Sequence, residues 1–287
     1  MTAPWLSIII PTYNGERYLS AALESINSQT NTDIECIIVD DGSTDSTVKI
    51  IEALDRNIPR TVKKIDHTGN WVANSNYALS LAKGKYICFL HQDDFWLPDR
   101  MKIVKEVLDG APATELFLCS AIYANVKGQT IGQWRCPLPP RSMPLASGLL
   151  KSRLLIQNFI AISSPVFNRE SALTVGGLDE SLWYTADWDF WLKLSESANI
   201  FYYPRPLAAL RIHPMSQTIR RSFDIRSFSE QLSTVFQKHY STWQADEKSR
   251  RRTEKNAMFS IQVNVQLAAC IHGGKLNVFK LLFGFFR

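Results

Sequence analysis

Short, continuously apolar segments alternate with amphipathic segments over the first 120 residues of this 287-residue chain. The apolar segments cover residues 6–10, 34–39, 62–65, 86–90 and 115–120. Strands that are apolar on both faces are typical of a parallel sheet whose two faces are covered by helices. The alternation therefore predicts an α/β fold built on an open, mostly parallel sheet with helices on both faces.

Apolar residues recur at helical spacing between these predicted strands. Helices are expected over residues 16–29, 48–54, 73–82 and 98–108. Beyond residue 120 the pattern is less regular. There we expect, in order, a Pro-rich loop over 133–144, a helix over 149–159, a strand near Val166, a turn at Gly176 and Gly177, a helix over 187–198, two short strands at 200–203 and 208–213, and helix beyond 220.

Charge is distributed unevenly along the chain. Residues 1–210 contain 19 Lys and Arg against 22 Asp and Glu, whereas residues 211–287 contain 13 against 5. This distribution argues against a nucleic-acid-binding protein, which carries a basic surface across its body. It favours a body that binds a small molecule and an end that contacts an anionic surface. We therefore predict a catalytic or binding domain over 1–215 and a basic helical C-terminal segment over 216–287.

Several classes of protein are excluded by what the sequence lacks. No run of 18 apolar residues occurs, so we expect no membrane-spanning helix. The apolar start has neither a basic leader nor a small-residue cleavage site, so we interpret it as a strand and not as a signal peptide. The five cysteines are scattered without a Cys-x-x-Cys pair. That usage indicates free thiols in a reducing cytosol and argues against zinc.

Polar residues follow three of the predicted strands directly, at residues 11–14, 40–45 and 91–94. Ligands of an open parallel sheet bind at the carboxyl ends of its strands. Two of these clusters contain adjacent carboxylates, which repel each other unless a cation or hydrogen-bond donors lie between them. Magnesium-type ions commonly bind one or two carboxylates together with substrate phosphates. The residues therefore predict a metal and a phosphorylated substrate such as a nucleotide.

These polar clusters also have other possible roles. Asp45 or Ser46 is expected to cap the helix that follows, with Asp45 favoured. The window that begins at Asp41 imitates a calcium loop but has Ser46 where that loop needs glycine. The chain contains neither a Gly-x-Gly-x-x-Gly nor a Gly-x-x-x-x-Gly-Lys-Ser/Thr motif. This absence argues against the usual dinucleotide-binding loop and the ATP-binding P-loop. A phosphoryl-transfer enzyme with a strand-end aspartate is disfavoured, because no lysine or Ser/Thr partner is placed for it.

Five segments carry a resemblance to a known family. They are LSIIIPTYN at 6–14, IVDDGSTD at 38–45, LHQDDFWLPD at 90–99, GGLDE at 176–180 and DWDFWLKL at 187–194. In this order and spacing they resemble the motifs of family-2 glycosyltransferases of the GT-A fold. The resemblance implies an inverting enzyme that transfers one sugar from a UDP- or dTDP-sugar to an acceptor hydroxyl, in cell-surface polysaccharide or lipid-linked glycan assembly.

The resemblance assigns residues 1–120 to the nucleotide-sugar-binding half and 121–215 to the acceptor half. In the first half, Pro11 and Tyr13 would line the nucleobase pocket, with Tyr13 stacking on a pyrimidine. Asp41 would accept a hydrogen bond from the uracil or thymine ring, and Asp93 would lie toward the ribose.

Three further residues receive chemical roles from the same resemblance. Asp94 would bind the Mn²⁺ or Mg²⁺ that bridges the diphosphate, and His213 would lie near the diphosphate or the metal. Asp187 would be the catalytic base. The bland alternative for His213 is a packed, hydrogen-bonded histidine at a strand end.

The sequence departs from the family pattern in two places. Ala186 stands where the base motif usually has glutamate, and Ser75 precedes Asn76 where an Arg-Asn pair is usual. The first departure makes a non-catalytic nucleotide-sugar-binding module the alternative hypothesis. The Gln-x-x-Arg-Trp element of the polymerising branch is absent, which favours transfer of one sugar per binding event. Trp183, Trp188 and Trp191 are expected to supply core packing or a sugar platform.

The C-terminal segment has two interpretations. Residues 248–255 are strongly basic, and residues 276–287 combine four Phe and three Leu with Lys280 and Arg287. Such a segment can lie in a membrane surface with its aromatic residues buried and its cations at the head groups. It can equally close over the core of the domain as a packed helix. The first interpretation places a cytoplasmic protein at the inner face of the membrane, in peripheral contact with it.

Overall fold

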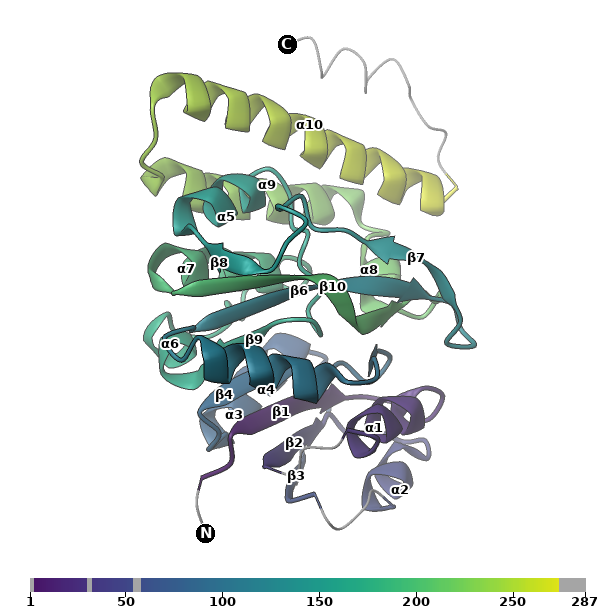
Figure 1. Cartoon of the computed structure of the whole chain (residues 1–287). Coiled ribbons are helices and arrows are strands. Elements are labelled where there is room, and N and C mark those ends of the chain that lie inside the picture. The colour runs from purple at the N-terminus through teal and green to yellow at the C-terminus, as the bar shows by residue number, and fades with distance from the viewer. Residues whose placement is uncertain (1–2, 30–32, 54–57, 274–287) are drawn as a thin grey trace.

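The computed structural model describes residues 3–29, 33–53 and 58–273 of the chain (Figure 1). Within these residues ten strands form one sheet, in the order β3-β2-β1-β4-β9-β6-β10-β5, with β7 paired to β6 and β8 paired to β10. The first four of them by sequence are β1 (Leu6–Thr12), β2 (Ile34–Asp40), β3 (Arg60–Lys64) and β4 (Tyr86–Phe89). All their mutual pairings are parallel, which confirms the predicted parallel sheet in this half.

The other half of the sheet mixes both directions. Its strands are β5 (Phe95–Trp96), β6 (Leu116–Ala124), β7 (Thr130–Trp134), β8 (Met143–Leu145), β9 (Val166–Asn168) and β10 (Ile200–Arg211). Strands β6 and β10 are parallel to each other, and the short β9 joins them to the first half through antiparallel pairs with both β4 and β6. Strand β9 therefore runs against both of its neighbours, while β6 and β10 keep the direction of β4.

Two expectations for this half were wrong. The two short strands expected at 200–203 and 208–213 form the single strand β10, whose register against β6 shifts around Pro204 and Pro206. Proline donates no ladder hydrogen bond, so the shifts keep the strand paired past these residues. The Pro-rich segment expected as a loop over 133–144 contains the end of β7 and the start of β8.

Helices cover both faces of the sheet, as predicted. They are α1 (Leu19–Asn27), α2 (Thr47–Glu52), α3 (Trp71–Leu81), α4 (Arg100–Gly110), α5 (Ser147–Leu154), α6 (Arg169–Thr174) and α7 (Ala186–Ser197). Successive side chains of a strand point to opposite faces. Ile8 and Ile10 accordingly belong to the core under α1 and α4, while Ile9 belongs to the core under α3, α5 and α7. The five cysteines are free, and Cys36, Cys88 and Cys119 are buried.

Three further helices follow the sheet: α8 (Gln217–Arg221), α9 (Ile225–Thr242) and α10 (Glu247–Ile271). Helix α9 packs on α7, and α10 packs on α9 at the end of the molecule opposite β3 (Figure 1). The predicted C-terminal helical appendage is therefore confirmed as far as residue 271, while the boundary at 215 stays a prediction. The apolar segment 276–287 lies outside the described residues. Among the helices of the described residues, none has the length and apolar character needed to cross a membrane.

Candidate active site

A pocket of ≈ 1360 Å³ opens at the carboxyl ends of the parallel strands. Its wall combines the loops after β1, β2, β3 and β4 with the start of α7, the end of β10, α8 and α10. The structure brings all seven predicted site residues to this wall. They are Pro11, Tyr13, Asp41, Asp93, Asp94, Asp187 and His213.

The carboxylate of Asp41 is held by the loop that follows β3. Its Oδ1 accepts hydrogen bonds from the backbone N–H of Thr68 at 2.7 Å and from the Thr68 hydroxyl at 3.0 Å. Its Oδ2 accepts one from the N–H of Gly69 at 2.9 Å. Gly69 has a φ of 68°, a left-handed conformation that glycine adopts without strain. Asp41 is thus a buried and rigidly placed acceptor at the floor of the pocket.

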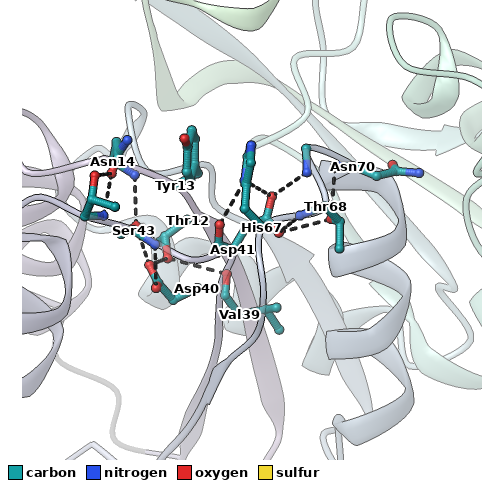
Figure 2. Close-up of polar contacts among 12 residues, drawn as sticks. Thr12, Tyr13, Asn14, Val39, Asp40, Asp41, Ser43, His67, Thr68 and Asn70 are labelled. Carbon is teal, nitrogen blue, oxygen red and sulfur yellow. Dashed lines mark hydrogen bonds and ion pairs between the residues drawn. The ribbon is translucent and has the colours of Figure 1, made fainter.

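His67, in the loop after β3, joins this arrangement. Its Nδ1 lies 3.0 Å from the backbone oxygen of Asp41 and 3.1 Å from Asp41 Oδ2. Its imidazole is stacked on the ring of Tyr13, with 4.0 Å between centroids and 16° between planes. Figure 2 shows the two rings standing side by side above Asp41.

Asp40, the neighbour of Asp41, has a structural role. Its carboxylate accepts hydrogen bonds from the Thr12 hydroxyl at 3.1 Å and from the hydroxyl and N–H of Ser43 at 2.5 and 3.1 Å (Figure 2). The loops after β1 and β2 are therefore tied to each other. Asp45 adds to this by accepting hydrogen bonds from the N–H groups of Thr47 and Glu16. The N-cap position of α2 is Ser46, so Asp45 lies one residue before the cap.

Asp93 and Asp94, the second pair of adjacent carboxylates, differ in their exposure to the pocket. Asp94 is buried, and its two oxygens accept hydrogen bonds from the Ser163 hydroxyl at 2.6 Å and the Arg211 N–H at 3.1 Å. The side chain of Asp93 is 24% exposed and lies 2.8 Å from Nε2 of His213. His213 is itself buried, and its Nδ1 has no hydrogen-bond partner among the described residues. Asp93 is therefore the more accessible of the two carboxylates.

Burial and mutual repulsion give the carboxyl groups of Asp93 and Asp94 different pKa values. Burial, together with the negative charge of Asp93, raises the pKa of Asp94 to about 8. Burial also acts to raise the pKa of Asp93, but the hydrogen bond to His213 and the nearby ring of His91 outweigh it and lower that pKa. Within the described residues no group of three or more His, Cys, Asp or Glu side chains forms a metal cage. A cation here would need oxygen ligands from a substrate as well.

Asp187 lies in the first turn of α7, on the pocket wall. Its Oδ2 accepts a hydrogen bond from the side-chain amide of Asn158 at 2.9 Å, and its Oδ1 accepts one from the N–H of Trp188 at 2.8 Å. Burial raises the pKa of Asp187 to about 6 against the effect of these two bonds. A carboxyl group with this pKa is suited to accept a proton near neutral pH. Ala186, where the family usually has glutamate, is wholly buried in the apolar core.

The three tryptophans near Asp187 differ in burial. Trp188 and Trp191 are buried core residues, and the indole N–H of Trp188 donates to the Leu154 oxygen at 2.8 Å. Trp183 is only partly buried and lines the pocket. The guanidinium of Arg221 lies 5.7 Å from its ring centroid. Trp183 is thus the one of these three indoles whose position suits a sugar.

Helix α7 is fastened to α9 by a buried ionic cluster around Asp189. Its Oδ1 lies 2.7 Å from Nε2 of His239 and 2.9 Å from Nζ of Lys238, and its Oδ2 lies 3.3 Å from Nζ of Lys193. Burial opposes the charge of Asp189, but these partners prevail and lower its pKa to about 2. The helix that carries Asp187 is therefore held in place by residues from the C-terminal segment.

Sequence reasoning missed two parts of the pocket wall. One consists of residues on β6, β7 and the loop after α5, namely Tyr123, Gln133, Trp134, Gln157 and Asn158. The other is one face of α10, with Ser260, Ile261, Asn264 and Leu267. The Ser260 hydroxyl donates to the Gln157 side chain at 3.1 Å and joins the two parts. No local motif marks these residues, and the face of α10 reaches the pocket only through the packing of that helix on α9.

Solved glycosyltransferases share this architecture and define the class of fold as GT-A. The crystal structure of residues 1–349 of S. aureus TarS in complex with UDP-GlcNAc matches with a TM-score of 0.64 at 17% identity, over 98% of this chain and 89% of that one. The mannosyltransferase PcManGT from Pyrobaculum calidifontis, in complex with GDP-Man and Mn²⁺, matches with a TM-score of 0.64 at 18% identity, over 99% and 79%. The predicted GT-A-type fold is confirmed.

The chain belongs to glycosyl transferase family 2, whose sequence model matches residues 7–173. A Rickettsia prowazekii protein named as an uncharacterized glycosyltransferase is 29% identical over 227 residues, which cover 75% of this chain and 66% of that protein. The chondroitin synthase of Escherichia coli is 31% identical over 195 residues, covering 67% of this chain and 27% of the synthase. The match thus spans just under two thirds of the first relative and about a quarter of the second.

Proposed function

We propose that the protein is a metal-dependent, inverting glycosyltransferase that moves one sugar from a UDP- or dTDP-sugar to an acceptor hydroxyl. The observation that carries this proposal is the position of Asp187. Its partly accessible carboxylate, with a pKa raised to about 6, lies on the same pocket wall as Tyr13, Asp41 and Asp93. A proton acceptor beside a nucleotide-type subsite is what direct sugar transfer to a hydroxyl requires.

The donor is assigned from the base side of the pocket. Asp41 is a buried acceptor beside the aromatic ring of Tyr13, which suits a pyrimidine whose ring N–H points at the carboxylate. Uracil and thymine have that N–H, and cytosine lacks it. The UDP and UDP-GlcNAc complexes of the similarly folded TarS support a uridine nucleotide. PcManGT has the same fold and was solved with GDP-Man, so the identity of the nucleobase needs an experimental test.

The residues present fit a divalent cation held partly by the donor. Asp93 has the accessible carboxylate and would hold Mn²⁺ or Mg²⁺, with the neighbouring imidazole of His213 as the second protein group beside the cation. The earlier expectation that Asp94 binds the metal fits less well, because both its oxygens already accept hydrogen bonds from the protein. When bound, the cation would neutralise charge on the departing diphosphate.

Asp187 acts as general base in a single displacement. The acceptor hydroxyl gives its proton to a carboxylate oxygen of Asp187 as the hydroxyl oxygen forms a bond to the anomeric carbon. The bond between that carbon and the diphosphate oxygen breaks on the opposite face, so the configuration inverts. Asn158 and the N–H of Trp188 hold the carboxylate in position. Asp94, bound to Ser163 and Arg211, keeps the loop of Asp93 in shape.

The acceptor is proposed to be a growing saccharide, in polysaccharide or lipid-linked glycan assembly. The partly buried ring of Trp183 and the aromatic residues Tyr123 and Trp134 on the pocket wall suit the apolar faces of sugars. Relatives named chondroitin synthase and hyaluronan synthase support this class of product. Each of these relatives is much longer than the stretch matched here.

The proposal is tested by nucleotide release from a panel of UDP-, dTDP- and GDP-sugars, with Mn²⁺ and with chelator. We expect release from a uridine or thymidine donor that chelator abolishes and Asp93→Ala removes. Nucleotide binding without any release, in the presence of saccharide acceptors, would favour the alternative of a non-catalytic nucleotide-sugar-binding module. The substitution of the usual glutamate by Ala186 is the observation on which that alternative rests.

Contact with the cytoplasmic face of a membrane is a separate proposal. It rests on the basic composition of residues 211–287 and on the aromatic segment 276–287. The full chain should float with anionic vesicles at low salt, whereas a 1–274 truncation should not. A full chain that ignores vesicles would favour a tail that packs on the domain.

A further inference from the structure

Under the proposed function a pyrimidine would need to contact Tyr13 and Asp41, and the side chain of His67 makes both contacts. Its ring covers one face of Tyr13, at 4.0 Å between centroids. Its Nδ1 lies 3.1 Å from Oδ2 of Asp41 and 3.0 Å from the Asp41 backbone oxygen (Figure 2). The imidazole thus resembles a base in the subsite: a flat aromatic ring with a nitrogen directed at the carboxylate.

No nucleobase fits between the two rings as they lie. They are already in stacking contact, and a third ring between them would need about twice their present centroid separation. A base that stacks on this face of Tyr13 and reaches Asp41 must therefore displace the imidazole.

The surroundings of His67 allow its side chain to move while its backbone stays. The next two residues, Thr68 and Gly69, donate their N–H groups to Asp41 at 2.7 and 2.9 Å. Gly42 lies so close that a Cβ there would be 3.0 Å from the backbone nitrogen of His67. The side chain itself is 47% exposed, so it can turn into water without leaving a cavity. Asp41 would keep its two N–H donors, and its Oδ2 could accept one more hydrogen bond in the place of the imidazole contact.

We propose that His67 is a movable residue that closes the base subsite, yields it to the donor nucleotide and returns to help release the product. The inference rests on the proposed function, because it takes Tyr13 and Asp41 as the base-binding residues. The pyrimidine replaces the imidazole on Tyr13, and its ring N–H replaces Nδ1 at Asp41. The reverse exchange expels the nucleoside diphosphate after transfer, a step that often limits turnover.

The test compares UDP binding, in the presence of Mn²⁺, by the full chain and three variants. His67→Ala removes the competing ring and should bind UDP about three- to tenfold more tightly, with a correspondingly slower dissociation rate in stopped-flow measurements. Tyr13→Ala should bind UDP more weakly. His272→Ala is the matched control: it removes a histidine that contacts Ser222 and Phe223 instead of Asp41, and it should leave UDP affinity unchanged.

A second readout needs no variant to be active. In the NMR spectrum of the wild-type protein, the ring protons of His67 should lie upfield because of Tyr13, and they should move toward free-histidine values as UDP saturates. His67→Ala identifies these resonances.

The outcomes separate the two proposals. Tighter UDP binding by His67→Ala, with weaker binding by Tyr13→Ala, supports the inference. Unchanged or weaker binding by His67→Ala, while Tyr13→Ala still loses affinity, overturns it and leaves the proposed function standing. A wild-type chain that binds neither UDP nor dTDP overturns both.

Discussion

The two sides of the pocket are held by different kinds of contact. On the nucleotide side, Asp40 accepts hydrogen bonds from Thr12 and Ser43, and Asp41 accepts them from Thr68, all at the ends of neighbouring parallel strands. On the side of Asp187, the supporting contacts join helices that are far apart in sequence, as in the ion pairs between Asp189 on α7 and His239 on α9. The first side is built by strand register, and the second by packing of the C-terminal helices.

This difference indicates how each side will fail. A substitution in the strand-end loops should act locally on nucleotide affinity, since the strands beneath them pack mainly on one another and on α3. A substitution between α7 and α9 should lower stability and displace Asp187 together, because one helix carries both features.

The largest effect is expected from Asp187→Asn. The amide keeps the shape of the side chain but cannot accept a proton, so turnover should fall by about 10²–10⁴-fold. UDP affinity, measured by calorimetry, should stay within about twofold of wild type, because Asp187 belongs to the other side of the pocket. Substantial remaining turnover would remove Asp187 from the role of base, and a large loss of UDP affinity would contradict the separation of the two sides.

Asp189→Asn should show the coupling of stability and site geometry on the α7 side. The substitution leaves Lys193, Lys238 and His239 without their buried carboxylate. We expect a loss of about 3 kcal/mol in the free energy of unfolding, measured with urea, and a larger fall in turnover than in UDP affinity.

Asp179→Asn is the matched control for this prediction. Asp179 also pairs with Lys238, at 3.1 Å, but its side chain is 33% exposed. Its removal should cost less than about 1 kcal/mol. Equal losses for the two variants would mean that the buried cluster does not fasten α7.

The same contrast explains which parts of the site could be predicted. Tyr13, Asp41, Asp93 and Asp94 follow continuous apolar strands directly, so strand register brings them to one edge of the sheet. Asp187 was found through its contiguous motif. The parallel half of the sheet was predictable for the same reason, because each of its strands is a separate apolar run.

Other features depend on contacts that no local pattern encodes. His67 stacks on Tyr13 only because β3 runs parallel to β2 and places the following loop against Asp41. The α10 wall of the pocket depends on the packing of α10 over α9. The different exposure of Asp93 and Asp94 depends on Ser163 and on the end of β10, both distant in sequence.

The pH dependence of turnover tests the environment of Asp187, and we expect a smaller effect there than from the substitutions of Asp187 and Asp189. Burial raises its pKa to about 6, so the carboxylate becomes protonated as the pH falls through 6 and can no longer accept the acceptor's proton. The rate should be level above this pH and fall about tenfold per unit below it. The hydrogen bond from Asn158 stabilises the charged form, so Asn158→Ala should move this limb to higher pH. A limb that does not move would assign it to another group.

The smallest effect is expected at the turn between α9 and α10. The guanidinium of Arg250 donates hydrogen bonds to the backbone oxygens of Tyr240 and Trp243 at the end of α9, and it lies 4.3 Å from the ring centroid of Tyr240. The basic run 250–252 is therefore not uniformly solvated. Arg250→Ala should lower the free energy of unfolding by about 1 kcal/mol and Tm by about 2–4 °C. The exposed Arg252→Ala should stay within about 0.5 kcal/mol of wild type. Equal effects would show that the turn draws no stability from Arg250, and that α10 is held by its apolar contacts alone.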